Sequence, residues 1–200
     1  MKKLLSLFGA LAVTVPAAAF AQSAGLDGVM DTVVATTADH WALGLAFLGA
    51  GMATALPCYG SSIGVSLVGQ AGSGLITEKP EMAGRVITLS VLPGSQGLYG
   101  MVVSLLFLFN FAGPLLDGSV ALTMADGFAL FGSFIPVSIA AFASAPYQGK
   151  VCAAGMHMLA KDSGLMGRVI TLAALVETYA LLGFLISFFM LTALSDNILN

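Results

Sequence analysis

The chain has 200 residues, of which 58% are hydrophobic and only 8% are charged, and its formal net charge is −3. Soluble domains carry about 25% charged residues, so this composition excludes an ordinary soluble domain and indicates an integral membrane protein. The two cysteines, Cys58 and Cys152, lie in or beside apolar segments without metal or disulfide spacing, and we expect both to be small buried side chains.

The first 21 residues have the pattern of a secretory signal peptide. Lys2 and Lys3 precede an apolar run, and Ala-Phe-Ala stands immediately before Gln22. We expect cleavage after Ala21, which would place the mature N-terminus outside the cytoplasm and indicates a bacterial protein. An uncleaved additional span is the alternative.

Four long segments that follow are almost free of charged residues, at 41–69, 86–116, 127–149 and 169–194. Each exceeds the ~20 residues that a membrane helix needs. Lipid also requires that backbone polar groups be satisfied within each helix. The sequence therefore predicts an all-α membrane protein with four transmembrane helices.

The remaining charges are distributed unequally between the connections. Every Lys and Arg after the signal lies at or within the connections near 79–85 and 150–168, whereas the acidic connection at 117–126 has no basic residue. Because cytoplasmic loops carry the excess of Lys and Arg, the two basic connections are predicted to be cytoplasmic. Both termini and the acidic connection then face the outside of a bacterial inner membrane.

A sequence repeat relates the two halves of the chain. The hexapeptide GRVITL occurs at residues 84–89 and again at 167–172, an offset of 83 residues. This offset predicts two copies of an antiparallel helical hairpin, 41–116 and 119–194. The single acid of the four apolar segments, Glu177, is equivalent to Gly94, so that only the second hairpin has a carboxylate at this position.

Several polar side chains are predicted to lie at the height of Glu177. Residues equally far from the turn between two antiparallel helices lie at equal height, which places Gln148 level with Glu177. The repeat places Ser95 and Gln96 of the second span at this level too, with Tyr99 about one helical turn away. The sequence therefore predicts a polar layer built from three helices.

A carboxylate in this layer needs a neutralising partner, because an ionised one at mid-membrane costs at least ~2.5–3.5 kcal/mol. Protonation is one solution and a bound cation is the other. Hydroxyl and amide oxygens are the hard ligands that suit Na⁺, and one carboxylate with one monovalent cation is neutral. The alternative is a structural role, in which Glu177 only hydrogen-bonds its neighbours and locks the bundle.

Small residues recur four apart along the first and third spans, and such ladders let helices approach closely in lipid. They fit ordinary packing inside one monomer, but their presence on both odd-numbered spans favours a ring of copies. The ladders include Gly49, Ala53 and Ser61 on the first span, and Ala141, Ala145 and Gly149 on the third.

Three segments carry a resemblance to a known family: LPGSQGLYG (92–100), APYQGKVCAAG (145–155) and ALVETYA (174–180). Together they resemble the proteolipid, subunit K or c, of V-type rotary ATPases, especially the sodium-translocating bacterial kind. The resemblance extends over residues 41–194. It implies a rotor ring of four-helix protomers that each carry one ion.

The resemblance also implies roles for the residues of the polar layer. Tyr99 would steady the carboxylate by a hydrogen bond. Ser95 stands where the sodium-type motif usually has threonine, and it retains the hydroxyl group. The implied ligands of the ion are the carboxylate of Glu177, the side-chain oxygens of Gln96, Gln148 and Ser95, and the backbone carbonyl of Leu92.

The partners that the resemblance implies are identical subunits in the ring, a stator subunit whose arginine discharges each site, and central-stalk subunits at the two cytoplasmic loops. ATP would be hydrolysed elsewhere in the complex, so the chain is not expected to be an enzyme by itself. We expect no organic cofactor, no nucleic acid and no nucleotide, since the Gly-rich GQAGSG (69–74) lacks the Lys-Ser/Thr ending of a phosphate loop.

The sequence leaves alternatives open for the identity of the ion and for the class of protein. The ligand set favours Na⁺, but a lone carboxylate also suffices to carry H⁺ in the same kind of rotor. A stand-alone secondary transporter is another reading, since internal repeats occur there as well. A structural four-helix scaffold is the remaining alternative.

Overall fold

The computed structural model describes the backbone of residues 27–199 and the side chains of residues 40–199. The predicted signal peptide, 1–21, lies outside the described residues. The chain divides into two units, Met1–Trp41 and Ala42–Asn200. The helices described next belong to the second unit, except for the beginning of α2.

The first hairpin pairs one long helix with a broken one. Helix α2 (Asp27–Glu78) continues through Pro57 without interruption, and a 3-10 turn at Pro80–Met82 reverses the chain. The returning span contains two departures from α-helical geometry, a 3-10 turn near its middle and a π-helical turn near its end. Its segments are α3 (Ala83–Val91), the 3-10 turn Leu92–Gly94, α4 (Ser95–Phe107), the π-helical turn Leu108–Ala112 and α5 (Gly113–Leu116).

The second hairpin consists of α6 (Met124–Lys161) and α7 (Met166–Ile198), joined by a 3-10 turn at Ser163–Leu165. A capping box begins α6: the Asp126 amide donates to Thr123 Oγ1 (3.2 Å), and the Thr123 amide donates to Asp126 Oδ2 (2.9 Å). These two bonds satisfy backbone donors that a helix N-terminus leaves unpaired. The helix therefore begins directly after the connection between the hairpins.

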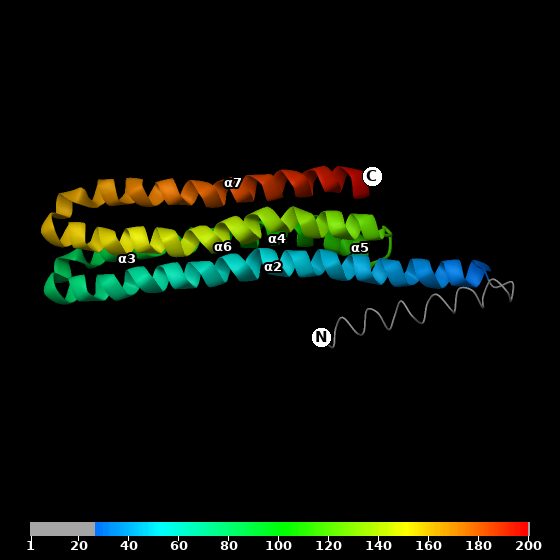
Figure 1. The fold of residues 1–200 in the computed structure, drawn as a ribbon, viewed down its shortest axis with the longest axis horizontal. Coiled ribbons are helices and arrows are strands. Elements are labelled where there is room, and N and C mark those ends of the chain that lie inside the picture. The colour runs from blue at the N-terminus through cyan, green and yellow to red at the C-terminus, as the bar shows by residue number, and fades with distance from the viewer. Residues whose placement is uncertain (1–26, 200) are drawn as a thin grey trace. The chain divides into compact units, whose positions relative to one another are not determined.

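Within the described residues, four helical spans are long and apolar enough to cross a membrane, with mean hydropathies between 1.5 and 2.1. In the second unit they run side by side along one long axis (Figure 1). Residues 27–198 contain helices and short turns but no strand. The prediction of an all-α protein with four membrane-spanning helices is thus confirmed. The spans are His40–Glu78, Pro80–Leu116, Met124–Lys161 and Ser163–Ile198.

One expectation from the sequence is wrong. Cys152 is buried as expected, but Cys58 is exposed. Cys58 lines a groove between α2 and α4, where its thiol donates to the Gly97 carbonyl oxygen (3.9 Å).

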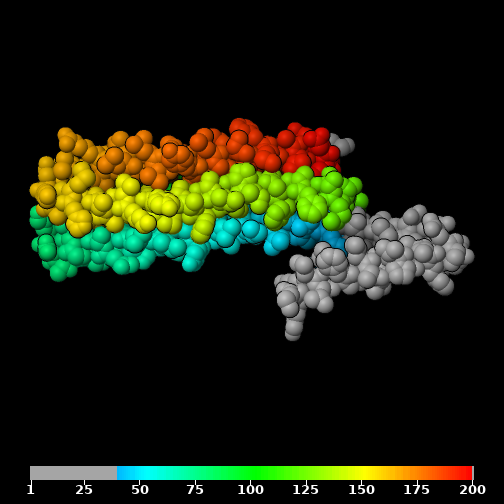
Figure 2. Space-filling view, in the orientation of Figure 1, coloured from blue at the N-terminus to red at the C-terminus, as the bar shows by residue number. Residues whose placement is uncertain are grey.

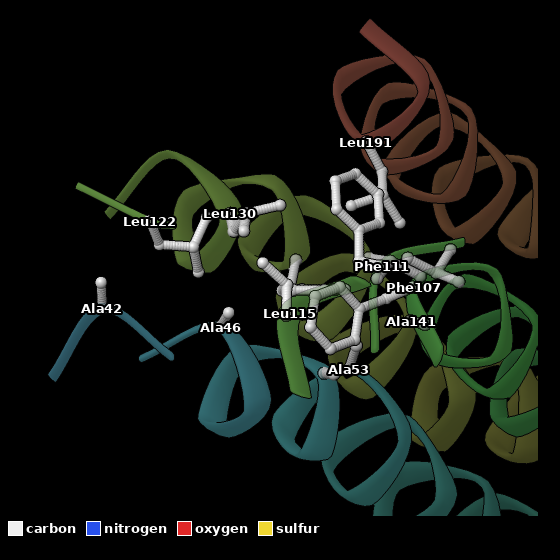
Figure 3. Close-up of a cluster of buried hydrophobic side chains, with 14 of the residues drawn as sticks. Ala42, Ala46, Ala53, Phe107, Phe111, Leu115, Leu122, Leu130, Ala141 and Leu191 are labelled. Atoms are coloured by element: carbon white, nitrogen blue, oxygen red, sulfur yellow. The ribbon is translucent and has the colours of Figure 1, made fainter. Parts of the chain in front are cut away.

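Two apolar clusters flank the middle of the bundle. One lies toward the connection between the hairpins and includes Phe107 and Leu130 (Figure 3). The other lies toward the two turns inside the hairpins and includes Val68 and Leu89. The predicted polar layer falls between these clusters, so apolar packing holds its helices in place on both sides.

The two hairpins pack internally in the same way. Gly100 lies against Ala53 in the first hairpin, and Gly183 lies against Pro136 in the second, each without room for a Cβ atom. The two pairs are related by the 83-residue offset, so the sequence repeat is also a structural repeat. A further related set is Gly72 against Val86 and Gly155 against Val169.

Helices α2 and α6 come into backbone contact between the hairpins. A Cβ atom at Gly60 would lie 2.5 Å from the Phe142 carbonyl oxygen, and one at Gly149 would lie 2.5 Å from Gly64 Cα. Only glycine allows this approach, as expected for small-residue ladders. Figure 2 shows α6 between α2 and α7 on one face of the second unit. These ladder positions therefore serve packing within one chain.

Candidate ion-binding site

The site begins with the 3-10 turn that interrupts the second span. Pro93 in this turn has no amide hydrogen, so the helical hydrogen-bond pattern is broken here. Ser95 follows directly and donates from Oγ to the Leu92 carbonyl oxygen (2.9 Å). The turn thereby holds the Ser95 hydroxyl and the Leu92 carbonyl next to each other.

The Glu177 carboxylate of α7 faces this turn. Its Oε1 atom accepts hydrogen bonds from Ser95 Oγ (2.8 Å) and from Tyr99 Oη (2.5 Å). Both donors belong to α4, in the first hairpin. Tyr99 also packs its ring against Phe184 of α7, with ring centroids 5.6 Å apart. The single acid of the apolar segments is therefore held by side chains of the other hairpin.

Two amides complete the layer, and both are fully buried. Gln148 of α6 donates from Nε2 to the Ala173 carbonyl oxygen (3.1 Å) and, over a longer distance, to Glu177 Oε2 (3.4 Å). Gln96 of α4 donates from Nε2 to Gln148 Oε1 (2.5 Å). Because a buried amide without partners is costly, this pair fixes the relative positions of α4, α6 and α7 at one level.

The electrostatic character of the site is that of one acid among neutral dipoles. Within residues 40–199, the hydrogen bonds to the Glu177 carboxylate all come from hydroxyl and amide groups. Lys150 follows Gln148 by two residues, but its ammonium group lies over the Tyr147 ring, 5.0 Å from the ring centroid. In this part of the chain, therefore, no basic side chain neutralises the acid.

The arrangement offers oxygen atoms to a small cation. The carboxylate carries the charge, and neutral oxygens lie around it on two helices and one turn. Gln96 Oε1 is within 3.4 Å of Ser95 Oγ, so it belongs to the same group of oxygens. Oxygen atoms of this kind suit hard cations, and they equally suit a protonated carboxyl group that donates to one of them.

The structure brings together all six residues that the sequence singled out, but one of them is linked to Glu177 only indirectly. Gln96 is linked to Glu177 by hydrogen bonds through Gln148 and through Ser95. Two contacts were not expected from the sequence. The Ala173 carbonyl accepts a hydrogen bond from Gln148, and Ser61 Oγ, of the small-residue ladder on the first span, accepts from the Gly97 amide (2.9 Å) and ties α2 to α4. The six are Leu92, Ser95, Gln96, Tyr99, Gln148 and Glu177.

Comparison with known proteins shows which family the chain belongs to. The family model of the ATP synthase C subunit matches residues 48–107 and again residues 131–190, so that the two matches are offset by 83 residues like the sequence repeat. V-type sodium ATPase subunit K of Enterococcus hirae is 39% identical over 147 residues, which are 72% of this chain and 90% of that protein. A-type ATP synthase subunit K of Methanocaldococcus jannaschii is 33% identical over 147 residues, which are 74% of this chain and 61% of that protein.

Each family match covers one hairpin, and together they include every residue of the candidate site. The double match explains why two hairpins share one packing pattern. By name the relatives are subunits of a V-type sodium ATPase and of an A-type ATP synthase, which disfavours both a stand-alone transporter and a structural scaffold. The chain belongs to the family of the ATP synthase C subunit, the ring-forming proteolipids of rotary ATPases.

Proposed function

We propose that this chain is the ion-carrying rotor subunit in the membrane sector of a V-type ATPase, and that the ion is Na⁺. One observation carries the proposal: the Glu177 carboxylate lies in an apolar hairpin, and its hydrogen-bond partners, from α4 and α6, are all neutral. Such a group can be made neutral by one monovalent cation. Movement of the ion would be coupled to ATP hydrolysis or synthesis in other subunits.

The charge balance explains why only the loaded site can face lipid. With Na⁺ bound, the site has no net charge and its polar atoms are paired. Without the ion, the carboxylate must meet water or a positive group, because an unpaired charge in the membrane is costly. An arginine on a neighbouring stator subunit would supply that positive group and displace the ion. Rotation would then carry each loaded site through the lipid to the next exchange position.

The residues of the site have distinct roles in this proposal. Glu177 supplies the charge, and Tyr99 holds the carboxylate in one rotamer by its hydrogen bond and its packing. The hydroxyl of Ser95 has lone pairs that it can direct to a cation while it keeps its position in the turn. The further oxygen donors are the side chains of Gln96 and Gln148 and the carbonyl of Leu92.

Sodium is preferred to the proton for two reasons. The neutral oxygens around Glu177 exceed what a proton carrier needs, since a carboxyl group alone carries H⁺. In addition, the E. hirae relative is by name a subunit of a sodium ATPase. A rotor that carries H⁺ at the same carboxylate is the competing assignment.

The proposal includes an orientation in the bacterial inner membrane. The basic turns at 79–85 and 161–168 would lie in the cytoplasm and contact the central stalk, and the connection at 117–123 would lie outside. The 1–21 segment would be a signal peptide that is removed. These assignments depend on the charge distribution rather than on the site.

Protection of Glu177 from an apolar carbodiimide tests the ion. The purified ring is treated at fixed pH with increasing Na⁺, and modification of Glu177 is measured by mass spectrometry. We expect saturable protection by Na⁺ and none by K⁺ or choline at equal ionic strength. Protection that follows pH alone would assign H⁺ instead.

Two variants make the labelling experiment specific. Glu177→Gln should abolish the modification. Glu81→Gln should leave it unchanged, because Glu81 lies exposed in the turn between α2 and α3. Labelling that persists in Glu177→Gln would contradict the assignment of Glu177 as the ion-binding group.

A further inference from the structure

The second span starts again as an α-helix directly beside the candidate ion site. Helix α4 begins at Ser95, after the 3-10 turn Leu92–Gly94, so the backbone amides of its first turn have no partners within α4. A side chain at the N-cap position normally accepts a hydrogen bond from one of these amides. Gly94 occupies this position and has no side chain, so it cannot supply such a cap.

Helix α2 supplies the acceptor instead. Ser61 Oγ accepts a hydrogen bond from the Gly97 amide (2.9 Å), and Gly97 is the third residue of α4, whose amide an N-cap side chain commonly binds. Ser61 is only 7% exposed and Gly97 is buried. Loss of the bond would therefore leave a buried amide without this partner, which is costly.

The same helix packs against the start of the turn. A Cβ atom at Gly64 would lie 2.6 Å from Pro93 Cβ, so the backbone of α2 lies directly against Pro93. Gly64 and Ser61 are about one helical turn apart on α2. Together the Pro93 contact and the hydrogen bond to Gly97 hold segment 93–97 at both of its ends.

The sequence repeat shows that the bond between helices accompanies the broken helix. Ser144 is the equivalent of Ser61 and is similarly buried, but its hydroxyl donates to the Ala141 carbonyl of its own helix (3.3 Å). Ala180 takes the place of Gly97 in α7, which is continuous from Met166 to Ile198 and has no helix start to cap at this level. The serine occurs in both hairpins, whereas the cap occurs only in the one with the turn.

We propose that Ser61 is a positioning residue for the ion site, which caps α4 from the neighbouring helix and thereby holds the oxygens of the turn in the arrangement that receives the cation. Three of the proposed oxygen donors belong to this segment, namely the Leu92 carbonyl and the side chains of Ser95 and Gln96. Ser61 itself supplies no ligand. The inference rests on the proposed function, because it concerns cation binding at Glu177.

The effect of the cap on binding follows from the populations of two arrangements of the turn. A site that is only partly in its binding-competent arrangement binds its ligand more weakly by that fraction. Without the cap, the turn would leave this arrangement more often, although all oxygens of the site remain in the chain. Ser61 therefore acts on cation affinity through the turn.

Ser61→Ala tests the proposal in the purified ring, by protection of Glu177 from the carbodiimide. We expect the Na⁺ concentration for half-protection to rise about fivefold, as for the loss of one ordinary hydrogen bond. Ser61→Thr retains the hydroxyl and should stay within about twofold of the parent. Ser61→Cys has a weaker acceptor and should give an intermediate value.

Ser187→Ala is the matched control for a purely structural effect. Ser187 Oγ accepts from the Val137 amide (3.0 Å), which is another buried bond between the two helices of one hairpin. Ser187 lies ten residues along α7 from Glu177, or about 15 Å at the helical rise. Both alanine variants should lower the unfolding temperature of the ring, but only Ser61→Ala should weaken sodium protection. Equal weakening in both variants, or none in Ser61→Ala, would overturn the positioning role.

Hydrogen exchange gives a measurement that does not depend on the ion. Exchange of single amides is followed by mass spectrometry in Na⁺-free buffer, at Gly97 and at residues 94–96. We expect exchange about fivefold faster in Ser61→Ala and unchanged in Ser187→Ala. Unchanged exchange at 94–96 in Ser61→Ala would contradict the proposal. If the parent shows no sodium protection, the proposed ion is wrong, and the exchange at 94–96 still decides whether Ser61 positions the turn.

Discussion

The two hairpins share a fold but differ in the polar side chains that they contribute to the site. Both bury a small-residue contact between their helices, and both have apolar outer surfaces. Yet Glu177 and Gln148 of the second hairpin correspond to Gly94 and Val65 of the first. The first hairpin instead contributes the groups around the acid, including Ser95 and Tyr99.

This division teaches how a duplicated scaffold can concentrate function in one site. An acid in a membrane is tolerated only where partners surround it, and here two of the three hydrogen-bond donors to Glu177, Ser95 and Tyr99, come from the hairpin that has no acid. The hairpin without a carboxylate is therefore as necessary to the site as the one that has it. Substitutions that make the two hairpins more alike test this interpretation.

The largest effect is expected when the acid itself is removed, as Glu177→Gln. Two unit charges about 4 Å apart at an effective dielectric of about 20 attract each other by ~4 kcal/mol, so sodium affinity should fall roughly a thousandfold. Ion transport should be abolished. Retention of the assembled ring, checked by native mass, would show that the loss is chemical; transport that survives the change would contradict the assignment.

The next largest effect is expected for Gln148→Val, which gives the second hairpin the residue of the first. It leaves the buried Gln96 amide without its partner, at a cost of ~1–3 kcal/mol, and removes a donor to Glu177. We expect a lower unfolding temperature of the ring and roughly tenfold weaker sodium protection.

The double variant Gln96→Leu, Gln148→Val separates these two effects. Replacing both amides leaves neither amide buried without its partner, so the unfolding temperature should recover in large part. Sodium affinity should not recover, because the oxygens are still missing. Recovery of affinity in the double variant would show that the amides serve packing alone.

Much of this site could be predicted from the sequence because helical geometry is regular. The symmetry of a hairpin about its turn placed Gln148 level with Glu177, and the structure has them within 3.4 Å. The repeat then located Ser95 on another helix. These inferences need only a constant rise per residue and a known turn.

Other features could not be predicted, for physical reasons. The hydrogen bond from Gln148 to the Ala173 carbonyl involves a backbone atom that every residue possesses. The indirect link of Gln96 to the acid depends on rotamers, which spacing does not determine. The exposure of Cys58 depends on which helix face remains uncovered in one chain.

A smaller effect is expected for Ser95→Ala. The change removes the hydroxyl that donates to Glu177 and would contact the ion, which is worth about 1.2 kcal/mol or roughly eightfold in sodium affinity. Thr178→Ala is the matched control, because Thr178 is the repeat equivalent of Ser95 and donates to the Leu175 carbonyl. Its sodium affinity should stay within about twofold of the parent. Equal effects of both variants would mean that the hydroxyl of Ser95 has no special role.

The smallest effect is expected for Tyr99→Phe, which removes only the phenolic hydroxyl. Tyr99 donates to Glu177 Oε1 but is not an expected ligand of the ion, and a cation that neutralises the carboxylate weakens the need for a donor. We expect a loss of ~1 kcal/mol, about fivefold in the Na⁺ concentration for half-protection. The unfolding temperature should remain close to that of the parent, because the aromatic side chain at position 99 still packs against Phe184.

Tyr99→Leu distinguishes the hydroxyl from the aromatic ring, and it gives the first hairpin the residue that the second has at the equivalent position, Leu182. This variant loses the same hydrogen bond and also the aromatic contact, which is worth about 0.5–1.5 kcal/mol. Sodium affinity should therefore fall as far as in Tyr99→Phe, while the unfolding temperature should fall further. If Tyr99→Phe instead binds Na⁺ as tightly as the parent and only Tyr99→Leu is impaired, Tyr99 acts by packing, and its hydrogen bond does not hold the carboxylate for the ion.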